Sequence, residues 1–145
     1  MAIITKSTIL EIDTEKLFSL VSDVSKAVEL LPSIVDITDI KPLENGGTEC
    51  QLQIKMGNKT KTFNMQTTEY VENERIVRVS KSEKITIIDT VTLEPENSHT
   101  RLTSHVEVRV AIPLVGWLLA LFMVKKMAQE LEEGYTGLQK QLNNP

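Results

Sequence analysis

Apolar residues recur at helical spacing over the last part of the chain, residues 113–142. From Met127 onward they fall at the i, i+4, i+7 positions of a helix with one buried stripe. The preceding stretch, 114–124, is apolar almost throughout, and Pro113 suits a first helical turn because no donor is needed there. The pattern therefore predicts one helix over 113–142, about 45 Å long at 1.5 Å per residue.

Between Ile34 and Ile112, apolar and polar residues mostly alternate, as in strands that bury one face. Turn-forming residues divide this region, most clearly Asn45-Gly46-Gly47, a strong hairpin signal. A β-branched N-terminal stretch predicts another strand, and capping residues after it predict two short helices that end before Pro32. The predicted strands are 2–12, 34–44, 48–56, 60–71, 75–81, 85–94 and 100–112, and the predicted short helices are 14–22 and 24–31.

The order strand, two helices, six strands and one long helix predicts an α+β fold. Its antiparallel strands form one meander, and about seven twisted strands curl strongly. Such a sheet, wrapped around the C-terminal helix, leaves a space between the two layers, and the short helices close one end. The length suits one domain over residues 1–145.

Two short motifs connect this order of elements to a known family. They are Val21-Ser22-Asp23-Val24 followed by Leu30-Leu31-Pro32, and Val71-Glu72-Asn73-Glu74-Arg75-Ile76-Val77. Both resemble segments of polyketide cyclases and coenzyme-Q-binding proteins in the START-like, or SRPBCC, superfamily. That resemblance implies the helix-grip fold and a hydrophobic small molecule held under the last helix. The chain departs from the coenzyme-Q-binding pattern, which usually has an aromatic residue soon after the proline, whereas Ser33 and Ile34 stand here.

Inward positions of the predicted elements supply the candidate ligand-binding residues. We expect the strands and the short helices to contribute Val28, Leu52, Ile54, Phe63, Met65, Thr67, Asp89, Val91, Ser104 and Val106. A helical stripe at about 100° per residue adds Trp117, Leu121 and Val124.

Asp89 is the one candidate acid–base residue. It shares the period-2 set of Ile87 and Val91, and a carboxylate in an apolar cavity has a raised pKa. A β-bulge would instead turn Asp89 outward, because Ile88 on the other face is apolar as well. The enzyme alternative is a cyclase or dehydratase in which Asp89 is the acid–base residue and Ser104 or Thr67 orients the substrate.

The opposite side of the long helix carries an apolar patch of Leu118, Leu119 and Phe122, in the sector that is polar further along the helix. Clustered exposed apolar residues indicate an interaction surface. Three interpretations stay open: a homodimer contact, a peripheral membrane contact helped by Lys125 and Lys126, or cover by loops of the same chain.

Composition narrows the function classes. A net charge of −4 argues against nucleic acid as the main partner. Cys50 is the only cysteine, so an internal disulfide is excluded and a buried, inert thiol is expected. With two histidines and no ligand motif, no metal and no cofactor are expected. The N-terminus lacks a signal peptide and the apolar run is too short for a membrane span, which predicts a cytoplasmic protein.

These observations favour a non-catalytic binder or carrier of a hydrophobic small molecule, such as a lipid, an isoprenoid or a polyketide-like compound. The alternatives are the Asp89-dependent enzyme and a protein-interaction module that uses the patch at the start of the long helix.

Overall fold

The computed structural model describes residues 1–27, 29 and 31–143. It contains one antiparallel sheet in the order β1-β7-β6-β5-β4-β3-β2, three α-helices and the loops that join them. The strands are β1 Ala2–Leu10, β2 Ile34–Pro42, β3 Thr48–Met56, β4 Lys59–Val71, β5 Arg75–Ser82, β6 Ile85–Glu96 and β7 His99–Val110. The helices are α1 Thr14–Ser22, α2 Val24–Ala27 and α3 Gly116–Asn143.

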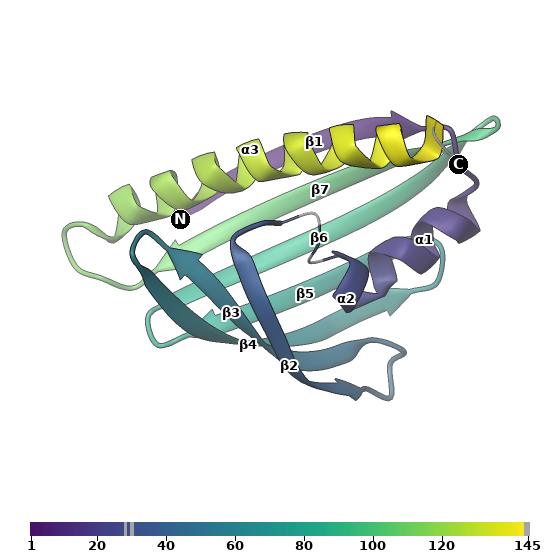
Figure 1. The fold of residues 1–145 in the computed structure, drawn as a ribbon. Coiled ribbons are helices and arrows are strands. Elements are labelled where there is room, and N and C mark those ends of the chain that lie inside the picture. Colours follow the sequence, from purple (N-terminus) through teal and green to yellow (C-terminus); the bar gives the residue numbers. More distant parts are fainter. Residues whose placement is uncertain (28, 30, 144–145) are drawn as a thin grey trace.

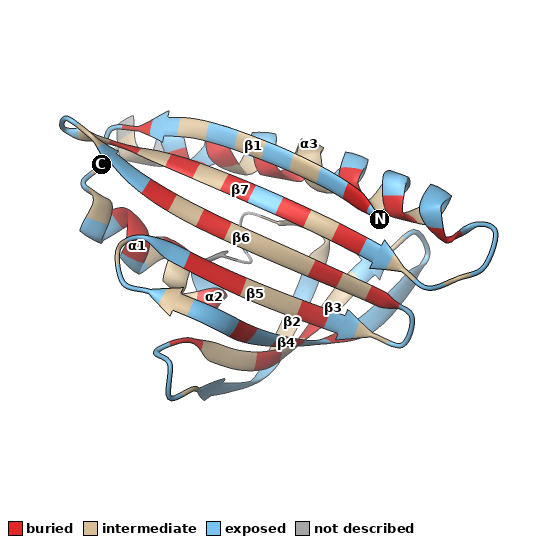
Figure 2. Ribbon diagram, turned by 180° about the vertical axis from the view of Figure 1, so that it is seen from behind, coloured by how far each residue is buried: buried red, intermediate tan, exposed pale blue. Residues whose placement is uncertain are grey.

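This architecture confirms the predicted order of elements and the meander from β2 to β7, with β1 added beside β7. α3 runs along one face of the curved sheet, and α1 and α2 lie on the same side of the sheet as α3 (Figure 1). Seen from behind, the strands show buried and exposed residues in alternation, as expected for strands with one face toward a core (Figure 2).

Local signals in the sequence explain the main boundaries. Asp13 caps α1, because its side chain accepts a hydrogen bond from the Lys16 amide at 2.8 Å. Asn45 stabilises the turn between β2 and β3: its side-chain oxygen accepts from the Gly47 amide at 2.8 Å, and its nitrogen donates to the Thr67 carbonyl at 3.0 Å. Gly46 takes the left-handed φ of 99° that this turn requires.

α3 begins later than predicted, at Gly116 rather than Pro113. Leu114 has a φ of 71°, which turns the chain before the helix starts, and the Gly116 amide then donates to the Ile112 carbonyl at 2.9 Å. A Cβ on Gly116 would lie 2.6 Å from the Val110 carbonyl oxygen, so the helix starts directly against the end of β7.

Because α3 starts directly against β7, the face that its first half buries differs from the predicted one. Gly116, Ala120 and Val124 are buried, whereas Trp117 and Leu121 are 61% and 47% exposed. The prediction that Trp117 and Leu121 face the sheet was therefore wrong, because small residues and not large ones fit where the helix meets β7. In the second half the predicted stripe is right, with Leu131, Tyr135 and Leu138 buried.

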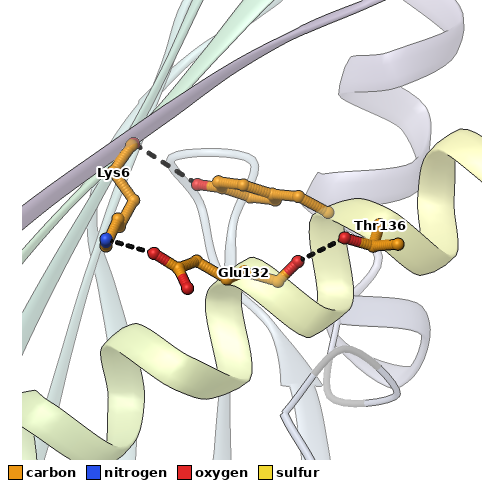
Figure 3. A network of polar contacts seen from close by, with 4 residues as sticks. Lys6, Glu132 and Thr136 are labelled. Atoms are coloured by element: carbon orange, nitrogen blue, oxygen red, sulfur yellow. Dashed lines mark hydrogen bonds and ion pairs between the residues drawn. The ribbon is translucent and has the colours of Figure 1, made fainter.

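Polar contacts connect α3 to the edge strand β1. The Lys6 ammonium pairs with Glu132, and the Tyr135 hydroxyl oxygen lies 3.4 Å from the Lys6 carbonyl oxygen (Figure 3). Thr136 on the following turn bonds back to the Glu132 carbonyl at 3.0 Å. α3 packs on β1 and β7, at one side of the sheet, and this leaves the inner faces of the other strands free to line a cavity.

Candidate functional site: a cavity between the sheet and the long helix

A cavity of about 710 Å³ lies between the sheet and α3. Its walls come from α1, α2, α3 and strands β2 to β7. Most of the lining is apolar, and the volume falls within the range of pockets that hold small organic ligands. The curl of the sheet predicts a space at this place, between the two layers.

The cavity brings together about half of the predicted ligand-binding residues. Those that line it are Leu52, Ile54, Met65, Asp89, Val91 and Ser104. All six lie on inward positions of β3, β4, β6 and β7, where strand periodicity was the only guide. Whether they contact a ligand stays a prediction.

The other predicted residues lie elsewhere. Phe63, Thr67, Val106 and Val124 are buried in the packing around the cavity and do not line it. Thr67 is occupied at the β2–β3 turn, where its hydroxyl accepts from the Thr48 amide at 3.2 Å. Trp117 and Leu121 point away, because of the rotation of α3. Val28 lies outside the described residues.

The rotation of α3 also changes the predicted outer patch. Leu118 and Phe122 are exposed, at 44% and 67%, as predicted. Leu119, however, is only partly exposed and lines the cavity, and Phe122 lines its edge. The patch and the cavity, which the sequence suggested were on opposite sides of the helix, are continuous.

Asp89 points into the cavity from β6, so the bulge that would turn it outward is absent from its pairing with β5 and β7. Burial raises the pKa of this carboxyl, and the Arg78 guanidinium and His105 oppose that shift only in part. Asp89 is thus held where its neutral form is favoured more than in water.

Arg78 is a site residue that the sequence analysis missed. It lies directly opposite Asp89 on β5 and lines the cavity. One Nη2 hydrogen donates to the Val21 carbonyl at the end of α1, at 2.7 Å, and its buried Nε has no hydrogen-bond partner in the described part of the chain. Arg78 alternates with Ile76 and Ser80, and this period of two could have placed it on the inward face of β5. Because residues 76, 77 and 79 are all apolar, however, the sequence did not show which face points inward.

Ser104 and Tyr135 form a second polar pair in the cavity wall. The Tyr135 hydroxyl donates to the Ser104 hydroxyl at 2.7 Å. Burial raises the pKa of Tyr135 to about 12, with a smaller contribution from the nearby Asp89 charge. Tyr135 is therefore a neutral hydrogen-bonding group at physiological pH.

Glu130 joins α3 to the loop before β2 across another side of the cavity. Its carboxylate accepts from the Ser33 amide at 2.9 Å and from the Ser33 hydroxyl. Glu130 is buried and lines the cavity, so its two hydrogen bonds compensate for part of its desolvation.

One end of the cavity lies between the β3–β4 turn at Gly57 and the first half of α3, and we call it the mouth. It is lined by Lys59 and Lys61 of β4 and by Phe122 and Lys126 of α3. No ion pair within 4.0 Å involves these three lysines among the described residues. The mouth therefore carries uncompensated positive charge in a protein of net charge −4.

Exposed apolar side chains surround the start of α3 beside the mouth. We call this surface the helix-start patch, and it consists of Leu114, Val115, Trp117, Leu118, Leu121 and Phe122. Leu114 is 93% exposed. A cluster of this kind marks an interaction surface more often than chance exposure does.

Within the described part of the chain, no group of three or more His, Cys, Asp or Glu side chains is placed to hold a metal ion. Over the same residues, no helix is long and apolar enough to cross a membrane.

Comparisons with known proteins agree with this geometry. The structure resembles a START superfamily protein from Mycobacterium smegmatis at a TM-score of 0.78 and 17% identity, over 97% of this chain and 98% of that one. It also resembles DR_A0006 from Deinococcus radiodurans, at a TM-score of 0.72 and 12% identity over 100% of both chains. A third similar structure is Ara h 8.0201, at a TM-score of 0.67 and 15% identity, over 97% of this chain and 98% of that one.

These likenesses confirm the helix-grip fold. No curated protein matches the chain. The model of one protein family, described as polyketide cyclase / dehydrase and lipid transport, matches residues 1–143. By that match over nearly its whole length, the chain belongs to the polyketide cyclase / dehydrase and lipid transport family.

Proposed function

We propose that the protein binds and carries a hydrophobic small molecule, such as a lipid, an isoprenoid or a polyketide-like compound, in the cavity under α3. The observation that carries this proposal is a cavity of about 710 Å³ with a mainly apolar wall. Membership in a family that includes lipid transport supports it. An empty apolar space of this size would forfeit packing contacts on every side, and a bound apolar molecule restores them.

Native mass spectrometry of the purified protein, together with solvent extraction, tests the carrier function. We expect a bound apolar molecule, or uptake of one equivalent of a hydrophobic fluorophore by protein that was stripped of its ligand. A protein that stays empty and takes up no fluorophore would contradict the proposal.

The carrier must load and release its cargo, and we propose that it does so at an anionic membrane surface. The helix-start patch offers apolar side chains to the lipid interior, and Lys59, Lys61 and Lys126 at the mouth suit anionic headgroups. Because the patch and the mouth share Phe122, contact with the membrane would place the cavity opening at the lipid. The cytoplasmic location stays a prediction.

A homodimer is the weaker alternative for the same surface. In a two-fold contact only residues near the axis meet their own counterparts. A contact centred on Phe122, which the patch shares with the mouth, would bring the two Lys126 side chains close together, and no ion pair within 4.0 Å neutralises Lys126 among the described residues. A protein-interaction role without cargo would leave the cavity unexplained.

Trp117 provides a direct test, since it is the only tryptophan and it lies in the patch. We expect its emission to shift to the blue with vesicles of phosphatidylcholine and phosphatidylserine, and much less with phosphatidylcholine alone. Leu121→Glu should abolish co-sedimentation with the anionic vesicles, while Ile9→Glu, at an exposed apolar site on β1, should not. Equal binding of both vesicles, or a dimer in sedimentation analysis that Leu121→Glu dissociates, would contradict the membrane proposal.

Asp89 supports one other candidate function, a cyclase or dehydratase. It faces the cavity, and burial raises its pKa toward the range of a working acid–base group. Ser104 lines the cavity within the same group of polar residues and would orient a substrate, whereas Thr67 is engaged elsewhere. Incubating the protein with its extracted ligand tests this: loss of one water that disappears in Asp89→Asn supports an enzyme, and an unchanged ligand mass contradicts it.

A further inference from the structure

Two opposite charges face each other across neighbouring strands of the cavity wall and do not form an ion pair. Arg78 on β5 is directly opposite Asp89 on β6, and both line the cavity. Side chains in this relation are close enough to interact. Among the described residues, however, no ion pair within 4.0 Å joins them.

Arg78 is held in a position that leaves donors available. Its Nη2 donates to the Val21 carbonyl at 2.7 Å, and a cation is favoured there because the C-terminal end of a helix carries negative partial charge. Its Nε is buried beyond reach of the cavity and has no hydrogen-bond partner among the described residues. Its Nη1 is not buried in this way and makes no hydrogen bond there either, so Nη1 is the donor that the cavity leaves without an acceptor.

Asp89 supplies the complementary acceptor. In the described residues its carboxylate takes part in no side-chain hydrogen bond, and its neighbours on the inner face of β6 are the apolar Ile87 and Val91. Ser104 also lines the cavity, and its oxygen accepts from Tyr135, but no hydrogen bond joins it to Asp89 among the described residues. Arg78 therefore presents a donor, and Asp89 an acceptor, that no other side chain of the wall satisfies.

These groups lie far from the mouth. Arg78 is level with Thr67 on β4, which is six residues, or about 20 Å of strand, from Lys61 at the mouth. Along α3, Tyr135 is about 20 Å from Phe122. The wall between the two ends is mostly apolar and includes Leu52, Ile54, Met65, Met123 and Met127.

Arg78 and Asp89 lie at the end of the cavity away from the mouth, which we call the inner end. Their charges favour some ligand head groups over others. A carboxylate would be repelled by the ionised form of Asp89, and an ammonium would be repelled by Arg78. A plain hydrocarbon would leave the Nη1 group of Arg78 and the carboxyl group of Asp89 without hydrogen-bond partners. A hydroxyl group both accepts and donates, so it satisfies the two residues at once.

We propose that the ligand is a long apolar molecule that ends in a hydroxyl group, bound with this group at the inner end between Arg78 and Asp89 and its apolar part toward Phe122. The inference rests on the proposed carrier function and names the class of molecule that the carrier takes.

Three molecules with one chain length test the proposal by displacement of a hydrophobic fluorophore: 1-dodecanol, its methyl ether and dodecanoate. The ether keeps the acceptor and loses the donor. We expect the alcohol to bind about tenfold more tightly than the ether and the carboxylate at neutral pH, as one lost charged hydrogen bond implies. In Arg78→Met/Asp89→Leu the alcohol and the ether should bind equally, while Arg75→Met, at an exposed arginine of the same strand, should keep the preference.

The outcomes separate the two proposals. Equal binding of alcohol and ether by the unmodified protein overturns the hydroxyl subsite and leaves the carrier function standing, and so does tighter binding of dodecanoate. Failure of every molecule and of the fluorophore to bind overturns both. If the double variant does not fold, Asp89→Asn, which is nearly the same size, should still lower the preference of the alcohol over the ether.

Discussion

Asp89 lowers the stability of the fold at neutral pH, because burial raises its pKa above that of the unfolded chain. At a pH between the pKa of Asp89 in the unfolded chain and its higher pKa in the folded protein, the native state binds more protons than the unfolded state. The free energy of unfolding therefore falls as pH rises through this window and stays lower above it. We predict that the stability of Asp89→Asn relative to the unmodified protein increases from pH 4 to pH 7. Urea unfolding at both values measures the difference, and a constant or decreasing difference would show that Arg78 outweighs burial.

Cys50 shows the same effect of burial on a different group. Cys50 is a buried residue of β3, and burial raises the pKa of its thiol to about 11, so little of it is thiolate at pH 8. We predict that a water-soluble disulfide reagent labels Cys50 at least about a hundredfold more slowly in native protein than in urea-unfolded protein. Rapid labelling under native conditions would mean that β3 opens locally.

At the scale of single residues, alternation along one strand was enough to predict which side chains point inward. It did not predict positions that depend on contacts with another element. The alternation of Ile87, Asp89 and Val91 was enough to place Asp89 inside the cavity. Arg78 was missed because a charged residue among valines and isoleucines indicates an outward position. Its actual place depends on the Val21 carbonyl of α1, which is distant in the sequence.

At the scale of elements, the strands were predicted closely because turn residues mark both ends of most of them. The start of α3 could not be predicted in the same way. Every rotation of an apolar stretch such as 114–124 buries apolar residues, so periodicity does not choose among them. The choice depends on the distance to β7, where Gly116 lies against the Val110 carbonyl and leaves no room for larger side chains.

Two of the three glycines of α3, Gly116 and Gly137, separate the effect of close packing on the sheet from that of helix propensity. Gly116→Ala should destabilise the protein by about 1–3 kcal/mol, because its Cβ would lie 2.6 Å from the Val110 oxygen and push the helix off the sheet. Gly137→Ala should stabilise it by about 1 kcal/mol, because an exposed mid-helix glycine with nothing within 4 Å gains helix propensity.

Chemical denaturation of both variants measures these changes. Since the substitution is the same in each case, general effects of an added methyl group cancel in the comparison. Two equal shifts in the same direction would mean that the close contact at the start of α3 does not hold in solution.

At the scale of the whole molecule, packing and binding are divided between two parts of the sheet. α3 is docked on β1 and β7 through its buried stripe and through the contacts of Lys6, whereas the cavity extends over the inner faces of β2 to β6 and reaches β7 only at Leu102 and Ser104. The sequence predicted both layers and the space between them. It did not predict the mouth, because Lys59, Lys61 and Phe122 come together only through the curl of the sheet.

This division implies that the cavity can be filled without loss of the fold. Ser80 is buried on the inner face of β5 and lines the cavity between Met65 and Ile87. In Ser80→Trp the indole would extend into free space, where it gains apolar contacts and excludes cargo. We predict that fluorophore binding weakens by about tenfold or more, while the unfolding temperature changes by only about 2–4 °C.

Val79 provides the matched control, because the next residue of a strand points to the opposite face. It does not line the cavity, so Val79→Trp should leave fluorophore binding unchanged. Titration of both variants, with thermal unfolding of each, distinguishes a blocked cavity from a damaged sheet. If Ser80→Trp bound the fluorophore as the unmodified protein does, the binding site would lie outside the cavity, on the helix-start patch. If it lost its cooperative unfolding transition, the inner faces of β4, β5 and β6 would have to support the fold as well as the cargo.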